Sequence, residues 1–476
     1  MSIRKTRAAH SRHEATPFIS LMPVVSSVVF ALLLWKVVET FIAPNFGYYG
    51  YIPRSTTPWE LVTCATIIVL LGALLPSRWT KPSDYSRGFL TATFGIPVVL
   101  VPTFWGPSDT PTLLTIHLVT FLVFALIKFL TSGPLWTTPR IDVSAPAFWT
   151  VVSVFVLFAI VYLFASTGIS ASFLSLNDVY SQRDEYASSI GGIGAYLVGW
   201  VGSGILPAML VAGLYYRTRT LSIGAIVGIL FLYSLTGYKS YLVGMALTLL
   251  GFVLCRQWLR RGYGWFIGLG IAVSFAAIFD HVTEGFALTS LLVRRALSTA
   301  GLNTSFFFDF FKQNDLYMLR HSIFSFLGDP PSDLSPAKLI GLAYYGSEKT
   351  AANANLIADG YANFGVVGCL FMAVILGLYL KLFDSASDHL PLQISAPALT
   401  LVLVALSNTA ALTTLTTHGG IIALILVTLM PPTGDLKATN SAAEVIQRSS
   451  PTRNRRSSLR ANMSRAGQRK NKKVTR

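Results

Sequence analysis

The sequence predicts an all-α polytopic membrane protein with about 12 transmembrane helices and one large extracytoplasmic loop. Of the 476 residues, 53% are hydrophobic and only 12% are charged, and the mean hydropathy of +0.57 lies far outside the range of soluble globular domains. Apolar stretches of about 17 residues or more, which let a helix cross a hydrocarbon core of roughly 30 Å, recur along the whole chain. Hydropathy and repetition together therefore indicate membrane-spanning helices.

The predicted spans follow one another with short connections until the long polar segment. They comprise residues 17–43, 59–76, 88–105, 112–130, 146–166, 193–215, 220–236, 239–256, 263–280, 356–382, 394–410 and 413–430. The seventh and eighth spans are separated by a very short turn, as are the last two, so each pair is either a tight helical hairpin or one misread segment. The first span is longer than a signal-peptide core and lacks a small-residue cleavage site, so we expect it to be retained.

Lysine and arginine counts predict the orientation, because positively charged loops resist translocation. With both termini in the cytoplasm, the inner segments hold 27 of the 37 basic residues and the outer segments hold nine. This partition favours 12 spans and places residues 281–355, the long polar segment, on the extracytoplasmic side. ATP and nucleotide sugars are absent there, so chemistry driven by them is not expected in this segment.

The basic tail explains most of the net charge of +16. Eleven positive charges follow Gln447, in a stretch without acidic residues that is disordered by composition. The chain thus divides into a basic cytoplasmic N-terminus (1–16), a membrane domain (17–430) and a disordered basic cytoplasmic tail (431–476). The tail is expected to touch anionic lipids, at about 1 kcal/mol per basic residue. Docking of a partner or phosphorylation are alternatives, and no nucleic-acid partner is expected.

No cofactor or metal is predicted. The three cysteines, Cys64, Cys255 and Cys369, are too scattered for a disulfide framework or a CxxC site, and the seven histidines lack zinc-ligand spacing. An Asp-X-Asp motif of the kind that holds a divalent ion in nucleotide-sugar enzymes is also missing from the sequence.

The long polar segment begins with two adjacent arginines and an aromatic run. Arg294 and Arg295 lie in a stretch of helical periodicity that leads into FFFDFF at 306–311. This pattern predicts an amphipathic helix at the membrane interface, with its aromatic side toward the lipid. The two arginines either extend to the interface as ordinary snorkelling residues or bind phosphate oxygens bidentately.

Further candidates lie later in the segment and at two other span ends. Arg320 and His321 are adjacent, and a histidine accepts a proton near neutral pH because its unperturbed pKa is about 6.5. Lys239 lies at the outer end of the eighth span, and Arg183 lies in a second outer loop at about 167–192. Each of these residues alone is also compatible with a purely structural role.

Three polar residues at the mouth of the tenth span recur at every fourth position. This spacing places Asn355, Asp359 and Asn363 on one face of a helix, where Gly360, Gly365 and Gly368 permit close helix contact. An acid that enters a membrane helix is costly unless it faces a polar cavity or a partner. Asp359 is therefore a functional candidate, and the alternative is an acid that interacts with the helix dipole or with Lys349.

The ordered motifs TGYKSYL, VRRALSTAGLNTSFFFDFF, YMLRHSIFSFL and AYYGSEKTAANANLIADGYANFGVVGCL resemble those of the oligosaccharide repeat unit polymerases, the Wzy-like O-antigen and capsule polymerases. The resemblance covers roughly residues 175–372. Lys239 stands where this family more often has an arginine. The resemblance implies a GT-C-like glycosyltransferase of the bacterial inner membrane. It would transfer a growing glycan from undecaprenyl pyrophosphate to a newly flipped repeat unit, with the lipid bilayer, a flippase and a chain-length regulator as partners.

The resemblance also implies roles for the candidate residues. The cations assigned to the pyrophosphate are Lys239, Arg294, Arg295 and Arg320, and Arg183 would bind the acceptor or a lipid phosphate. Either His321 or Asp359 would be the catalytic base. The asparagines that would bind sugar hydroxyls or shape the cavity are Asn353, Asn355 and Asn363. An O-antigen ligase or another polyprenyl-linked transferase is the alternative enzyme, and a lipid-linked oligosaccharide flippase is the alternative from another class.

Overall fold

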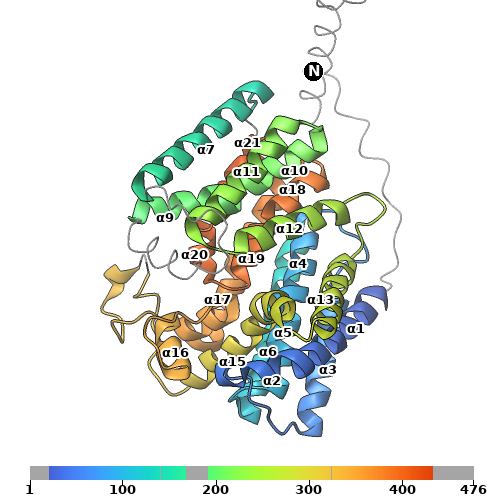
Figure 1. The fold of residues 1–476 in the computed structure, drawn as a ribbon, viewed down its shortest axis with the longest axis vertical. Helices are drawn as coiled ribbons and strands as arrows, with labels where there is room; N and C mark the ends of the chain where they lie inside the picture. Colours follow the sequence, from blue (N-terminus) through green and yellow to red (C-terminus); the bar gives the residue numbers. More distant parts are fainter. Residues whose placement is uncertain (1–20, 140, 168–190, 323, 433–476) are drawn as a thin grey trace, which may run out of the picture.

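The computed structural model describes residues 21–139, 141–167, 191–322 and 324–432, which form helices joined mostly by short connections, with a longer irregular one between α15 (Thr299–Phe311) and α16 (Pro336–Tyr345) (Figure 1). Within these ranges no strand forms beyond two isolated bridges, Pro53 with Trp105 and Arg78 with Arg261. The predictions for the basic N-terminus, for Arg183 and for the basic tail lie outside the described residues.

The N-terminal part of the bundle, as far as residue 167, supplies its first five apolar helices. Its elements are α1 (Leu21–Val37), η1 (Val38–Ile42), α2 (Ala43–Phe46), η2 (Gly47–Tyr49), α3 (Pro58–Ala73), α4 (Pro82–Leu90), η3 (Thr91–Gly95), α5 (Ile96–Phe104), α6 (Thr110–Ser132) and α7 (Ala145–Thr167). Elements η1 and η3 are π-helical turns that continue the preceding α-helix, so α1 and α4 each begin a longer helix.

The remainder of the bundle contains the helices that surround the candidate site. Its elements are α9 (Gly192–Gly199), η4 (Trp200–Ile205), α10 (Leu206–Tyr216), α11 (Arg219–Thr236), α12 (Ser240–Leu254), α13 (Gly264–Val282), α14 (Ala287–Thr289), η5 (Ser290–Ser298), α15 (Thr299–Phe311), η6 (Ser325–Leu327), α16 (Pro336–Tyr345), α17 (Leu356–Ala386), α18 (Leu392–Ser395), η7 (Pro397–Leu399), α19 (Thr400–Leu406), α20 (Ala411–Thr416) and α21 (Gly420–Leu429).

Nine helices among the described residues are long and apolar enough to cross a membrane, which confirms a multi-pass membrane protein. The remaining three predicted spans coincide with shorter apolar helices, at 58–73, 240–254 and 392–406. The count of 12 spans stays a prediction. The two doubtful pairs each form separate helices, since α11 ends at Gly237, where φ is +65°, and α19 ends before α20 begins at Ala411.

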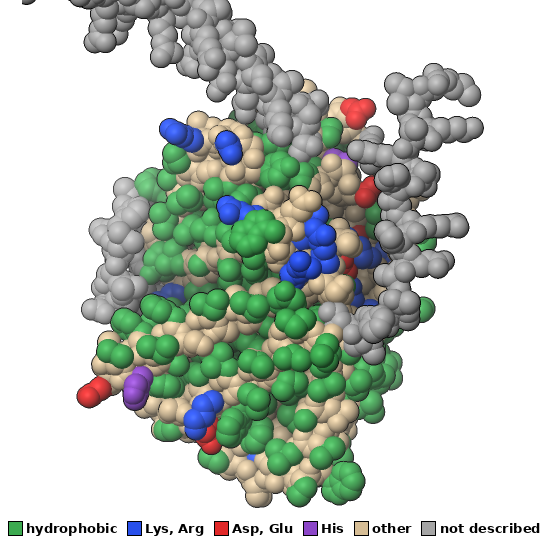
Figure 2. All heavy atoms as spheres, turned by 90° about the vertical axis from the view of Figure 1, so that its right-hand side faces the viewer, with side chains coloured by type: hydrophobic (Ala, Val, Ile, Leu, Met, Phe, Trp, Pro, Cys, Tyr) green, Lys and Arg blue, Asp and Glu red, His purple; other side chains and the backbone are tan. Residues whose placement is uncertain are grey.

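The outer surface of the bundle is apolar, as a hydrocarbon solvent requires. Apolar side chains are spread widely over the face drawn in Figure 2, where charged side chains form scattered spots or a small group. Helix α13 illustrates the pattern, because exposed large side chains recur every three or four residues along it, among them Ile267, Ile271, Phe275 and Ile278. Its buried face, which includes Leu269, points into the bundle.

The 281–355 region differs from the predicted interfacial helix. A helix does form over residues 287–311, as α14, η5 and α15, but the residues from Ala300 to Phe308 are all buried inside the protein. The prediction that the aromatic run faces the lipid is therefore wrong. Close packing explains the burial, since a Cβ on Gly301 would lie 2.1 Å from the carbonyl oxygen of Pro97 in α5. Polar positions such as Asn303 find their partners within the protein.

Helix α17 breaks near its start and folds back on itself. Phe364 and Gly365 leave helical geometry, and Gly365 has φ +61°. A Cβ on Gly360 would lie only 2.7 Å from the Cα of Cys369, although a continuous helix would separate these positions by about 13 Å. The prediction of close helix contact is confirmed for Gly360 and Gly368, with both helices belonging to one broken segment, whereas Gly365 forms the break itself.

Candidate functional site

A cavity of about 560 Å³ lies between the start of α12, the π-helix η5, α13, the end of α19 and the turn between α20 and α21. Its apolar lining comes from residues within α4, α12, α13 and α19 and includes Phe89, Leu247, Leu269, Val273 and Leu401. Its polar lining comes mostly from helix ends and includes Lys239, Arg295, Asn353, Asn408, Thr417 and His418. We call this space the α12 cavity. Its lining is amphipathic, with a cationic and amide portion and an apolar portion.

Lys239 places a positive charge at the start of α12. The residue is the N-cap of this helix and is half-buried, and no ion pair or hydrogen bond of its ammonium group occurs within the described part of the chain. The N-terminus of a helix is already positive, so a cation there opposes the helix dipole unless an anion is present. Backbone N–H groups at the same helix start also attract anions. The local geometry therefore suits an anionic ligand.

The two adjacent arginines of η5 have different surroundings. Arg295 lines the α12 cavity. Arg294 is 7% exposed and lies 4.2 Å from the ring centroid of Phe46 and 5.1 Å from that of Tyr49. Its Nε also donates to Ser290 Oγ at 3.2 Å. The structure thus brings Arg295 to Lys239 at one cavity and directs Arg294 into a packed aromatic contact.

Asn353 reaches the cavity from the segment before α17. Its backbone carbonyl accepts a hydrogen bond from Asn303 Nδ2 at 2.9 Å, and Tyr345 in turn donates to Asn303 Oδ1 at 2.6 Å. Its side-chain Nδ2 lies 3.4 Å from Asn408 Oδ1 at the end of α19. The buried helix α15 therefore holds this segment in place and presents an amide pair to the cavity.

Asn355, Asp359 and Asn363 share one helix face, as predicted, but they are absent from the cavity lining. Asn355 caps α17 by accepting from the N–H groups of Ile357 and Ala358, and it donates to Thr304 Oγ1 at 2.7 Å. Asn363 donates to Asp359 Oδ1 at 3.2 Å. This face packs inside the protein, where Asp359 is 5% exposed and forms no ion pair within the described chain.

Arg320 and His321 lie on a segment clamped to the break in α17. Asn363 Oδ1 accepts from the N–H of Leu319 at 2.8 Å, which holds Leu319 at φ +62°. Arg320 donates to the carbonyl of Asp329 at 3.1 Å. His321 Nδ1 is buried without a hydrogen-bond partner, and burial lowers the pKa of this imidazole. Neither residue lines the α12 cavity.

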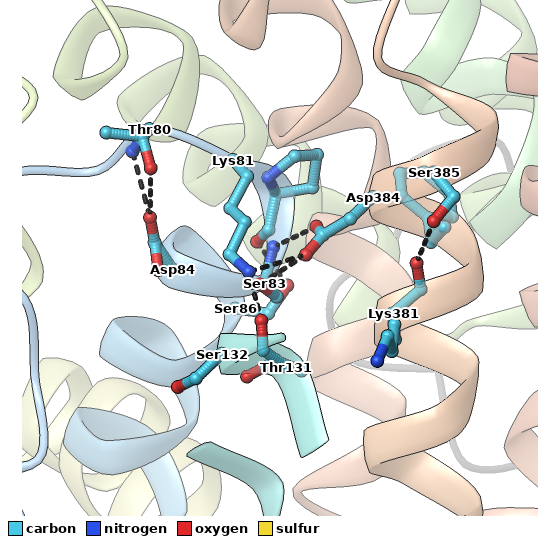
Figure 3. A network of polar contacts seen from close by, with 12 residues as sticks. Thr80, Lys81, Ser83, Asp84, Ser86, Thr131, Ser132, Lys381, Asp384 and Ser385 are labelled. Carbon is cyan, nitrogen blue, oxygen red and sulfur yellow. Dashed lines mark hydrogen bonds and ion pairs between the residues drawn. The ribbon is translucent and has the colours of Figure 1, made fainter. Parts of the chain in front are cut away.

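A further polar region, the α4 network, connects the start of α4 with the ends of α6 and α17 (Figure 3). It consists of Thr80, Lys81, Ser83, Asp84, Arg87, Thr131 and Asp384. Asp384 accepts from Ser83 N at 2.8 Å and from Ser83 Oγ at 2.6 Å, and it lies 3.5 Å from Lys81 Nζ. Arg87 pairs with Asp84 at 2.6 Å. Charges in this network are balanced, which indicates a structural role.

His418 is the residue that sequence reasoning missed. It lies in the turn between α20 and α21, inside the segment predicted as the last span, and it lines the cavity. The available signal was the same one that singled out Asp359, namely an ionisable side chain within a membrane segment. Its neighbours Thr416 and Thr417 make that stretch more polar than the rest of the span.

The α12 cavity can bind a molecule with an anionic head and an apolar body, since its cations and its apolar wall are contiguous. In the described part of the chain no group of three or more His, Cys, Asp or Glu side chains is placed to hold a metal ion. Comparison of the chain with protein-family models, with curated proteins and with solved structures finds no match.

Proposed function

We propose that this protein is a membrane glycosyltransferase that polymerises undecaprenyl pyrophosphate-linked oligosaccharide repeat units on the extracytoplasmic face of the bacterial inner membrane. The GT-C-like fold with 12 spans is part of this proposal. The observation that carries it is the amphipathic α12 cavity, in which Lys239 and Arg295 lie beside an apolar wall formed by helix interiors. A polyprenyl pyrophosphate has the matching combination of a double anion and a long apolar chain.

The chemistry of such a transfer requires three things from the protein. The departing pyrophosphate has to be stabilised, the acceptor sugar has to be oriented, and its attacking hydroxyl has to lose a proton. We assign Lys239 and Arg295 to the pyrophosphate, because cationic donors stabilise phosphate oxygens strongly where water is scarce. Asn353 and Asn408 supply amide groups for sugar hydroxyls. The roles predicted for Arg183, Arg294, Arg320, Asn355 and Asn363 remain predictions.

A reconstitution experiment tests the proposal directly. The purified protein is placed in lipid nanodiscs with a synthetic undecaprenyl pyrophosphate repeat unit, and the products are separated by size on a gel. We expect a ladder of glycans that differ by one repeat unit, with release of undecaprenyl pyrophosphate. Absence of any new glycosidic bond would contradict the proposal.

The same preparation separates the alternatives. Transfer of the glycan only to an added lipid A-core acceptor would identify a ligase. Movement of the lipid-linked repeat across a vesicle bilayer without bond formation would identify a flippase. Lys239→Ser should abolish the ladder, while Lys338→Ser provides a matched control, since Lys338 is an exposed lysine of α16 that does not line the cavity.

A further inference from the structure

The proton acceptor of the proposed reaction can be sought among the side chains that line the α12 cavity. Among the described residues, the lining contains no aspartate or glutamate, and its one histidine is His418. Lysine and arginine side chains, which Lys239 and Arg295 contribute to the lining, are hydrogen-bond donors and not general bases in this chemistry. Tyrosine, serine and threonine hydroxyls are weaker bases still. Among the described residues that line the cavity, His418 is therefore the side chain suited to accept a proton near pH 7.

Backbone contacts fix the turn that carries His418. Trp200 Nε1 donates to the carbonyl of Thr416 at 2.7 Å, and the Tyr379 hydroxyl donates to the carbonyl of Gly420 at 2.8 Å. Glycines bring the neighbouring helix against the same turn, since a Cβ on Gly199 would lie 2.0 Å from the carbonyl oxygen of Thr417. The position of the turn is thus set on both sides of the histidine.

The imidazole itself is left without such contacts. His418 is half-buried, and within the described chain its ring forms no hydrogen bond, ion pair or aromatic contact, although its backbone N–H donates to Thr413. A side chain that only stabilised the turn would use its ring nitrogens to bond the surrounding backbone, as His389 does with the carbonyl of Met430 at 2.8 Å. The contrast indicates that the ring nitrogens of His418 are available to a ligand in the cavity.

We propose that His418 is the catalytic base of the transfer, an inference that rests on the proposed function. One ring nitrogen takes the proton from the acceptor hydroxyl as that oxygen bonds to the anomeric carbon of the donor glycan. The bond between this carbon and the pyrophosphate oxygen breaks, and its electron pair leaves with the pyrophosphate, whose charge Lys239 and Arg295 stabilise. The protonated imidazole then returns its proton to water.

Turnover and binding measured on the same reconstituted protein test this role. His418→Ala should lower polymer turnover about 100-fold, as expected when a general base is lost, while undecaprenyl pyrophosphate binds within threefold of the wild-type affinity. Added imidazole should restore part of the turnover in His418→Ala, because it can occupy the vacated space. His281→Ala is the matched control, since His281 is exposed at the end of α13 and does not line the cavity.

The outcomes separate this inference from the proposed function. If wild-type protein forms polymer and His418→Ala retains its turnover, the role of His418 is overturned and the proposed function stands. If wild-type protein forms no polymer, both are overturned. His418→Gln guards against a folding defect, because it keeps a polar side chain at this position. Failure of imidazole to restore turnover to His418→Ala, together with lost lipid binding in both variants, would show a structural role instead.

Discussion

The α4 network and the α12 cavity differ in whether their charged side chains are paired with charges of opposite sign. In the network each charged side chain has a partner of opposite sign, Lys81 with Asp384 at 3.5 Å and Arg87 with Asp84 at 2.6 Å. Within the part of the chain that the structure describes, the cavity lining holds no acid and the Lys239 ammonium has no anionic partner. Helix α4 joins the two regions, since it begins in the network and its Phe89 reaches the cavity.

This difference distinguishes charged side chains that stabilise the fold from charged side chains that are available to bind a ligand. Removing a charge from water costs free energy that only a well-placed partner offsets. The α4 network meets this requirement internally and can be complete in the folded protein. In the cavity, Lys239 lacks such a partner, and the positive end of the helix dipole adds to the free-energy cost of its charge. A substitution should therefore reduce stability in the first region and function in the second.

The largest expected effect is on stability, at Asp384. Asp384→Ala would leave Lys81 and the Ser83 hydroxyl without their carboxylate, and removal of one partner from a buried pair costs on the order of 3 kcal/mol. We expect a clear decrease in the free energy of unfolding, measured by denaturation in detergent. Asp388→Ala is the control, because Asp388 is exposed. Equal stability of the two variants would show that the network does not hold α4 against α17.

The second-largest expected effect is on ligand binding, at Lys239 in the α12 cavity. Lys239→Ser should weaken binding of undecaprenyl pyrophosphate by about 30-fold, which corresponds to the roughly 2 kcal/mol of a charge-assisted hydrogen bond. Stability should stay the same or rise, since serine is a favoured N-cap and the repulsion between lysine and the helix dipole disappears. Binding by titration and unfolding by heat check the two halves of this prediction. A less stable protein would place Lys239 among the structural charges.

Ionic strength should affect ligand binding at the cavity more than stability of the α4 network, with a smaller effect than the substitutions above. Raising the ionic strength from 0.1 M to 1 M shortens the Debye length from about 10 Å to about 3 Å, so binding of a lipid pyrophosphate at Lys239 and Arg295 should weaken a few-fold. The buried pairs of the α4 network are screened much less, and the unfolding temperature should change little. Lys239→Ser should show a shallower salt dependence of binding than the wild-type protein. A salt-independent affinity would remove the electrostatic argument for the cavity.

The membrane helices and the face shared by Asn355, Asp359 and Asn363 could be predicted from the sequence. Hydrocarbon demands long apolar runs, and helical periodicity places every fourth residue on one side. The different environments of Arg294 and Arg295 could not be predicted from adjacency, because successive residues of a helix point in different directions. Which of them reaches a cavity depends on the packing of elements distant in sequence.

Burial of the aromatic run overturned the prediction that this part of the 281–355 region faces the lipid. The aromatic run near Phe306 suits a lipid interface and a protein core equally well by composition. The close approach of Gly301 to Pro97 selects the core. His418 was hidden for a related reason, since a single histidine scarcely changes the hydropathy of a predicted span, and only the fold shows that it faces a cavity.

The smallest effect concerns His321, an imidazole without a hydrogen bond at Nδ1 that lies outside the cavity. Burial lowers its pKa, so the folded protein takes up a proton less readily than the unfolded chain. Stability should therefore fall as the pH decreases below about 6.5, the unperturbed value. His321→Gln should lose less stability between pH 7.5 and pH 5 than the wild-type protein, measured by thermal unfolding at each pH. If His321→Gln instead abolished turnover and left this pH dependence unchanged, the base would be His321, as the sequence alone allowed, and not His418.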